Sequence, residues 1–260
     1  MKADVYNLEG AAAGKKVDLP VQFDEEVREE IIRRAVLSEE SKEYQPQGPY
    51  RWAGTETSAE YRGRKGDYGS LKNRGQAMLP REVRPKGLMG KVRRIPSAPG
   101  GRRAHPPKPE KKIVENINKK EYKKALLSAI AATAHPDLVK ARGHAYDGLA
   151  PIVFEDAFEA VKKTKDVIKA LTPIIGKDLE RAKNNRKARS GVRSRKAGTR
   201  TPKSALIVVS GGDILKSARN LAGVDVVSVE KLKVKDLAPG THAGRLTVYT
   251  EAALKKIGEL

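Results

Sequence analysis

The sequence has no cysteine, only one tryptophan and only three phenylalanines among its 260 residues. Without cysteine the chain can form no disulfide, thiol nucleophile or cysteine-ligated zinc site, which fits a reducing compartment. Long apolar runs are also missing, because the longest small-apolar run, residues 125–134, is about half of what a bilayer span requires. The first ten residues lack the apolar stretch of a signal peptide. We therefore expect a soluble, cytoplasmic protein with no membrane partner.

Acidic residues are few compared with basic ones. The chain has 53 Lys and Arg against 32 Asp and Glu, which gives a formal net charge of +21. A positive field of this size says nothing about the fold, but it favours polyanionic partners such as nucleic acid.

Between Tyr44 and Glu110 the chain lacks a hydrophobic pattern that could fold on its own. From Gln45 to Pro109 it has fifteen Lys or Arg and four acidic residues, a net charge of +11. A segment of this kind inside a compact domain is usually functional, or disordered until it binds. We expect residues 45–110 to be an extended loop that contacts RNA. A solvated linker is the alternative, but linkers rarely contain so many aromatic and arginine residues.

Three residue types in this loop suit RNA. Arginine pairs with phosphate through two hydrogen bonds and stacks on bases, glycine allows close approach of the backbone, and proline stiffens the segment. Aromatic rings among the cations can stack on unpaired bases, and we assign that role to Trp52, Tyr61 and His105. The RNA-binding candidates of the loop are Arg51, Trp52, Tyr61, Arg62, Arg64, Lys65, Lys72, Arg74, Arg81, Arg84, Lys86, Lys91, Arg93, Arg94, Arg102, Arg103 and His105.

A second basic segment spans residues 181–203, with ten Lys or Arg and no acidic residue. A localisation signal or a solvated helix face would have the same composition. Its spacing fits an irregular arm better than helical turns, and contact with the RNA backbone is the favoured interpretation. Its binding candidates are Arg186, Lys187, Arg189, Arg193, Arg195, Lys196 and Arg200.

The remainder, residues 1–44 and 111–260, has the pattern of a globular α/β domain. Continuous β-branched runs such as 205–210 and 224–229 are typical of strands buried on both faces of a parallel sheet. The expected strands are 3–8, 151–154, 205–210, 224–229 and 246–249, and the expected helices are 24–37, 118–134, 164–171, 213–221 and one at the C-terminus. Strands that alternate with helices predict a mostly parallel open sheet flanked by helices.

One turn resembles a phosphate-binding site. The sequence Ser210-Gly211-Gly212-Asp213 follows a strand and opens a helix, where amide groups can cradle a phosphate. It lacks both the G-x-G-x-x-G spacing and the Walker lysine, and Asp213 at the N-cap would repel an anion. A tight turn with a helix cap is the better interpretation.

No catalytic or metal-binding pattern emerges from the other polar residues. The four histidines, 105, 135, 144 and 242, lack helical i, i+4 spacing, so no metal site is expected. Asp147 and Asp156 flank a strand, but surface or capping roles suit them better than a carboxylate pair. We expect no enzyme and no cofactor.

Six stretches, in order and across most of the chain, resemble large-subunit ribosomal protein four in its archaeal and eukaryotic branch. They are VYNLEG (Val5–Gly10), TSAEYRGRKG (Thr57–Gly66), GGRRAHPP (Gly100–Pro107), INKKE (Ile117–Glu121), LLSAIAATA (Leu126–Ala134) and RGH (Arg142–His144). The C-terminus at Leu260 is similar to that of archaeal members. The resemblance implies an α/β domain on the outer ribosome surface and a long loop that threads through rRNA to the nascent-peptide exit tunnel.

By the same resemblance, the loop meets the loop of large-subunit ribosomal protein twenty-two and the nascent peptide. Its tunnel-facing tip is expected near residues 62–74, and the tip candidates are Arg62, Arg64, Lys65, Tyr68 and Arg74. The expected function is that of a structural constituent of the large ribosomal subunit that binds rRNA and aids assembly. A nucleotide-binding α/β enzyme acting on RNA and a free RNA chaperone are the alternatives.

Overall fold

The computed structural model describes residues 1–191 and 198–259, which form two units. One, the globular unit, comprises Met1–Glu43 and Val114–Leu260; the other, the basic unit, comprises Tyr44–Ile113. Among the described residues, no helix combines the length and the apolar character needed to cross a membrane.

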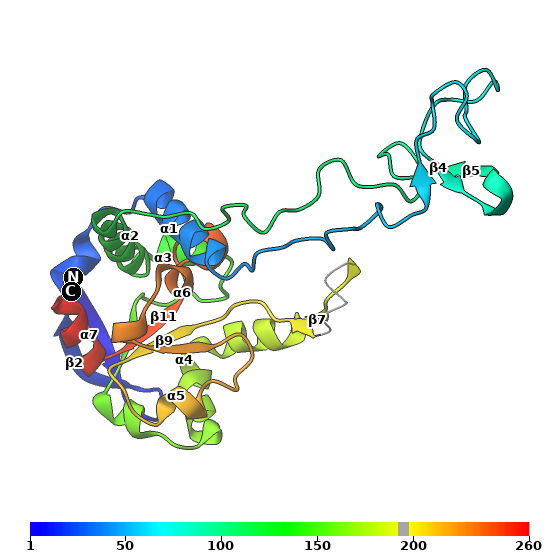
Figure 1. The fold of residues 1–260 in the computed structure, drawn as a ribbon. Helices are drawn as coiled ribbons and strands as arrows, with labels where there is room; N and C mark the ends of the chain where they lie inside the picture. The colour runs from blue at the N-terminus through cyan, green and yellow to red at the C-terminus, as the bar shows by residue number, and fades with distance from the viewer. Residues whose placement is uncertain (192–197, 260) are drawn as a thin grey trace. The chain divides into compact units, whose positions relative to one another are not determined.

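A six-stranded sheet forms the centre of the globular unit, in the order β10-β9-β11-β6-β1-β2 (Figure 1). All neighbouring strands are parallel except β1 and β2, which form an antiparallel hairpin at one edge. The strands are β1 Lys2–Tyr6, β2 Ala12–Asp18, β6 Ile152–Phe154, β9 Leu206–Val209, β10 Asp225–Ser228 and β11 Thr247–Thr250. The predicted α/β class with a mostly parallel sheet is confirmed.

Helices cover both faces of this sheet, which explains why strands β6, β9 and β11 are buried at every position. In β9, Leu206 and Val208 face one hydrophobic cluster, whereas Ile207 and Val209 face the other. The first cluster also contains buried residues of α1, α2, α6 and α7, and the second contains buried residues of α3, α4 and α5. The helices are α1 Glu29–Ser41, α2 Lys119–Ala132, α3 Pro136–Ala141, α4 Thr164–Asn184, α5 Ile214–Ser217, α6 Val234–Leu237 and α7 Glu251–Gly258.

The first helix begins later than the sequence predicts. The predicted cap, Asp24, ends a separate 3₁₀ turn, Val21–Asp24, and α1 starts at Glu29. Phe23 in that turn is buried and packs edge-on against Tyr249, with ring centroids 5.5 Å apart. Burial of this ring in the core keeps the turn Val21–Asp24 separate from α1.

Two other helices also differ in length from the prediction. Helix α4 continues through Pro173 to Asn184, and its backbone departs from helical geometry at Ile175. A proline inside a helix removes one backbone hydrogen bond and produces a bend without ending the helix here. Helix α5 is a single turn, Ile214–Ser217, in which Ile214 and Ser217 are buried. It is therefore shorter than the predicted helix 213–221.

The basic unit contains elements that the sequence did not indicate. Strands β3 (Ala59–Glu60), β4 (Arg81–Val83) and β5 (Met89–Val92) form a small antiparallel sheet, and β4 and β5 are seen side by side in Figure 1. The side chains of Ala59 and Leu71 are buried within this unit. Strands of two to four residues are too short to show a hydrophobic period, so the sequence did not reveal them.

Candidate nucleic-acid interface

Two ion pairs and two backbone contacts hold the loop segments of the basic unit together. Arg62 donates to Glu60 Oε2 at 2.9 and 3.1 Å and to the carbonyl of Tyr68 at 3.2 Å. Arg93 donates to Glu82 Oε1 and to the carbonyl of Pro99, both at 2.6 Å. The hydrogen bond from Arg93 lowers the pKa of the Glu82 carboxyl. Two of the predicted RNA-binding arginines are therefore engaged within the protein.

Two further arginines contact the backbone of the same unit. Arg81 donates to the carbonyl of Ala77 at 3.3 Å, and Arg94 donates to the carbonyl of Ala59 at 3.3 Å. The Nε atom of Arg81 is buried without a hydrogen-bond partner among the described residues.

The other predicted cations of the basic unit are exposed and free. Among the described residues, their side chains make no hydrogen bond or ion pair, and they are Arg64, Lys65, Lys72, Arg74, Arg84, Lys86, Lys91, Arg102 and Arg103. His105 is exposed as well. A surface of this kind leaves guanidinium and ammonium donors available for phosphate oxygens.

The aromatic candidates lie on the surface of the basic unit. Trp52 is 54% exposed and Tyr61 is 59% exposed, values that leave most of each ring available for stacking. The guanidinium of Arg51 lies over the Trp52 ring, 5.6 Å from its centroid. Tyr68 donates its hydroxyl to the carbonyl of Lys86 at 2.9 Å, which fixes one side of the ring while the residue stays exposed.

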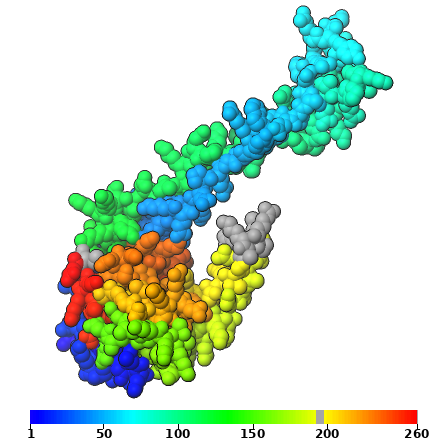
Figure 2. Space-filling view, turned by 60° about the horizontal axis from the view of Figure 1, so that its bottom comes forward, coloured from blue at the N-terminus to red at the C-terminus, as the bar shows by residue number. Residues whose placement is uncertain are grey.

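The second basic segment extends from the C-terminal end of α4 as a two-stranded hairpin, β7 (Lys187–Ala188) and β8 (Thr199–Arg200), shown in yellow in Figure 2. Arg186 donates to Thr199 Oγ1 at 3.0 Å, across the base of the hairpin. Lys187, Arg189 and Arg200 are exposed. The candidates Arg193, Arg195 and Lys196 lie outside the described residues.

A buried aspartate lies where α4 meets this segment. Asp178 is fully buried, and its two oxygens accept four hydrogen bonds, from Ala145 N, Arg181 Nε, His144 Nδ1 and Ser204 Oγ, at 2.6–3.2 Å. Burial acts to raise the pKa of this carboxyl, but the hydrogen bonds outweigh burial and hold its pKa well below the usual range. The carboxylate is therefore saturated by its own neighbours.

A fully buried arginine ties together the amino ends of three strands. Arg245, just before β11, donates to the carbonyls of Ser204 at 2.9 Å and Asp236 at 2.8 Å. It also pairs with Asp225, at the start of β10, at 2.6 Å, and Lys203 pairs with the same carboxylate at 2.7 Å. Sequence reasoning missed both this arginine and Asp178, because lone charged residues look like surface positions.

The turn at Ser210–Asp213 is occupied by a carboxylate. Glu159 Oε1 accepts hydrogen bonds from Ser210 N at 2.7 Å and Thr250 Oγ1 at 2.6 Å. Gly212 has a positive φ of +96°, and an added Cβ would lie 2.4 Å from the Glu159 carbonyl oxygen. Asp213 pairs with Lys162 at 3.7 Å. A phosphate would meet Glu159 and Asp213 here, which agrees with the predicted tight turn. Asp213 occupies the N-cap position of α5, but its side chain makes no capping hydrogen bond.

The remaining titratable candidates have structural surroundings. Asp156 caps the start of α7 by accepting from Ala252 N at 2.6 Å, and Asp147 lies 3.7 Å from the Lys140 amine on the surface. Within the described part of the chain, no group of three or more His, Asp or Glu side chains is placed to hold a metal ion.

Residues 17–260 match the family described as the ribosomal protein L4/L1 family. The chain belongs to this family. A "large ribosomal subunit protein uL4" from Methanoculleus marisnigri is 47% identical over 260 residues, covering 100% of this chain and 99% of the relative. Proteins of the same name from Methanocaldococcus jannaschii and Archaeoglobus fulgidus are 46% and 45% identical, each covering 100% of this chain and 99% of the relative.

Membership in this family confirms the predicted resemblance. The family and its named relatives are ribosomal proteins rather than enzymes, as predicted for this chain. The alternative of a nucleotide-binding enzyme loses its structural basis as well, because Glu159 fills the turn on which it depended.

Proposed function

We propose that the protein is a structural constituent of the large ribosomal subunit, and of the cytoplasmic ribosome, that binds rRNA through two cationic surfaces. The first is the basic unit, and the second is the β7–β8 hairpin. The observation that carries the proposal is the set of exposed Arg and Lys side chains of the basic unit that have no partner among the described residues. The names of the relatives support the assignment to the large subunit.

The charge distribution explains why an RNA partner is needed. Of the four acidic residues between positions 45 and 109, Glu60 and Glu82 each neutralise one arginine, so the remaining cations repel one another. Phosphates placed between them would remove this repulsion and release condensed counterions. The small sheet β3-β4-β5 would present the cations in a fixed order, so that the unit positions RNA without reading base sequence.

The finer part of the proposal concerns the exit tunnel. By the family resemblance, the basic unit reaches the nascent peptide and a loop of large-subunit ribosomal protein twenty-two, and it aids assembly. Among the tip candidates, Arg64, Lys65 and Arg74 have free side chains, whereas Arg62 and Tyr68 are engaged within the unit. We infer that the three free side chains make the outward contacts and that Arg62 and Tyr68 maintain the shape of the segment.

The test removes charge without removing structure. A quadruple variant with Gln at positions 64, 65, 72 and 74 should bind large-subunit rRNA more weakly. The slope of log K against log salt should fall in magnitude by about 2.8 to 3.6, because each phosphate contact contributes about 0.7 to 0.9. The matched control places Gln at four exposed lysines of the globular unit, Lys165, Lys169, Lys231 and Lys255. It should change the slope by less than about 0.7 to 0.9, the contribution of a single phosphate contact.

Equal slopes for both quadruple variants would contradict binding through the basic unit. A free RNA chaperone remains the alternative function, and sedimentation separates the two. A structural constituent stays with large subunits through a sucrose gradient in moderately high salt, whereas a chaperone is released to the top fractions.

A further inference from the structure

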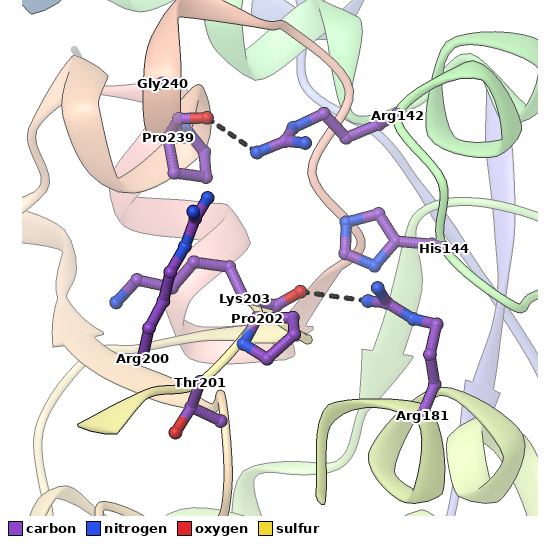
Figure 3. A pocket seen from close by; sticks show the side chains of 9 residues that line it. All are labelled: Arg142, His144, Arg181, Arg200, Thr201, Pro202, Lys203, Pro239 and Gly240. Atoms are coloured by element: carbon purple, nitrogen blue, oxygen red, sulfur yellow. Dashed lines mark hydrogen bonds between the residues drawn. The ribbon is translucent and has the colours of Figure 1, made fainter. Parts of the chain in front are cut away.

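A cationic pocket of about 360 Å³ lies in the globular unit, at the amino-end side of strands β9, β10 and β11 (Figure 3). Its walls include Arg142 and His144, which follow α3, Arg181 near the end of α4, and Arg200 and Lys203, which lead from the hairpin to β9. The lining is mostly basic, and no acidic residue among those that the structure describes contributes to it. Such a lining differs from the predominantly apolar walls of sites for drug-like organic ligands.

Arg142 is a half-buried cation without a carboxylate partner. Its guanidinium donates to the carbonyl of Pro239 at 2.6 Å, and its Nε atom is buried with no acceptor among the described residues. Burial lowers the pKa of this guanidinium, and the nearby charge of Arg181 lowers it further. A cation held in this way is stabilised by a bound anion.

Arg200 is the second free cation of the pocket. Its side chain makes no hydrogen bond or ion pair with any residue that the structure describes. In Figure 3, the guanidinium groups of Arg142 and Arg200 enter the same space from opposite walls. Two like charges that converge across an open space favour an anion between them.

The nearby carboxylates are already engaged. Asp178 accepts four hydrogen bonds, including one from Arg181 and one from His144. Asp225 pairs with Lys203 at 2.7 Å and with Arg245 at 2.6 Å. The acids therefore fix the walls of the pocket and leave the charges of Arg142 and Arg200 unbalanced.

We propose that this pocket binds one backbone phosphate of rRNA between Arg142 and Arg200. The proposal rests on the proposed function and adds a contact point between the base of the β7–β8 hairpin and the segment that follows α3. Asp178 acts through Arg181 and His144 as a positioning residue. The site lies at the amino-end side of the parallel strands, whereas α/β folds usually bind ligands at the carboxyl ends, where Glu159 already fills the corresponding turn in this chain.

The experiment uses the full chain and a transcript of archaeal large-subunit rRNA. Affinity is measured at several salt concentrations for the wild type, Arg142→Gln, Arg200→Gln and the double variant. A shared phosphate contact predicts that either single change reduces the magnitude of the salt slope by about 0.7 to 0.9, and that the second change adds little. Arg219→Gln, which removes an exposed cation elsewhere in the globular unit, should leave the slope unchanged.

Folding is checked separately by circular dichroism. Arg200→Gln keeps the test valid if Arg142→Gln unfolds the chain, because the Arg200 side chain makes no hydrogen bond or ion pair within the described part of the chain. Arg142→Lys retains the charge and should restore most of the slope. Wild-type slopes in both glutamine variants would overturn the phosphate site while the proposed function stands.

A second arm identifies the source of the phosphate. Thermal unfolding is followed with inorganic pyrophosphate as the probe, in the wild type and in the double variant. If the wild type does not bind the transcript, the proposed function fails. A pyrophosphate stabilisation that disappears in the double variant, without an effect of either change on the RNA slope, would assign the pocket to a free phosphate compound and overturn the rRNA contact.

Discussion

Replacing Arg245 with methionine should destabilise the globular unit strongly. The guanidinium is fully buried and makes short hydrogen bonds to the carbonyls of Ser204 and Asp236 and to the carboxylate of Asp225. Methionine retains most of the volume but leaves these three acceptors without their donor. The change therefore isolates the charge and the hydrogen bonds from the packing.

The size of the effect follows from the surroundings of Asp225. Removing one partner of a buried ion pair costs about 3–5 kcal/mol, because the other charge is left uncompensated. Here Asp225 keeps Lys203 at 2.7 Å, and its side chain is 32% exposed, so its charge is not isolated. We therefore expect a loss near the lower limit, about 3 kcal/mol in the free energy of unfolding.

The assay is urea unfolding of the full chain followed by far-ultraviolet circular dichroism. Lys2→Met is the matched control, because its exposed pair with Asp18 at 3.9 Å should contribute less than about 1 kcal/mol. A double-mutant cycle with Asp225→Asn should give a coupling of roughly 0.5–3 kcal/mol. A loss below about 1 kcal/mol for Arg245→Met would refute the assignment of Arg245 as the link between three strand ends.

Three further predictions concern other positions. The pKa of Asp178 in the folded chain lies below its unfolded value of about 3.9, so the carboxylate stabilises the fold fully above that pH and less as the pH falls below it. Asp178→Asn should therefore flatten the dependence of the urea midpoint on pH below about 4, and an unchanged curve would contradict this. Gly212→Ala should cost more than about 1 kcal/mol, and more than Gly240→Ala, because both have positive φ but only the first meets a backbone oxygen within 3 Å; equal losses in thermal unfolding would show that the contact is unimportant. Trp52 is the only tryptophan, so stacking on a base should quench its fluorescence during titration with rRNA and Trp52→Ala should weaken binding by about 1–3 kcal/mol, whereas unchanged emission would exclude stacking.

The central strands were predictable because they are buried on both faces. The predicted run 205–210 contains β9, whose four residues are all buried. The predicted run 224–229 contains β10, a half-buried edge strand that its consecutive valines revealed. Strand β2 was missed because it lies at the sheet edge, where only Val17 is even half-buried and lysines are tolerated. The sequence pattern therefore reports burial rather than strand formation.

The positive charge of the candidate interface was predictable from the sequence, but the arrangement of its side chains was not. An excess of Arg and Lys identifies the basic unit from composition alone. The division into free cations and those that hold the unit together depends on contacts such as the one between Arg93, just after β5, and Glu82 on the neighbouring β4. Composition contains no information about that register, nor about the burial of Arg245 or Asp178.

The two edges of the central sheet affect whether the newly made protein aggregates before its incorporation. At one edge, β2 is exposed along nearly its whole length and carries Lys15 and Lys16. At the other, β10 has only four residues and starts at the ion-paired Asp225. Charged or very short edge strands hinder pairing with another chain. The newly made protein is thus protected against aggregation through its sheet while it awaits incorporation.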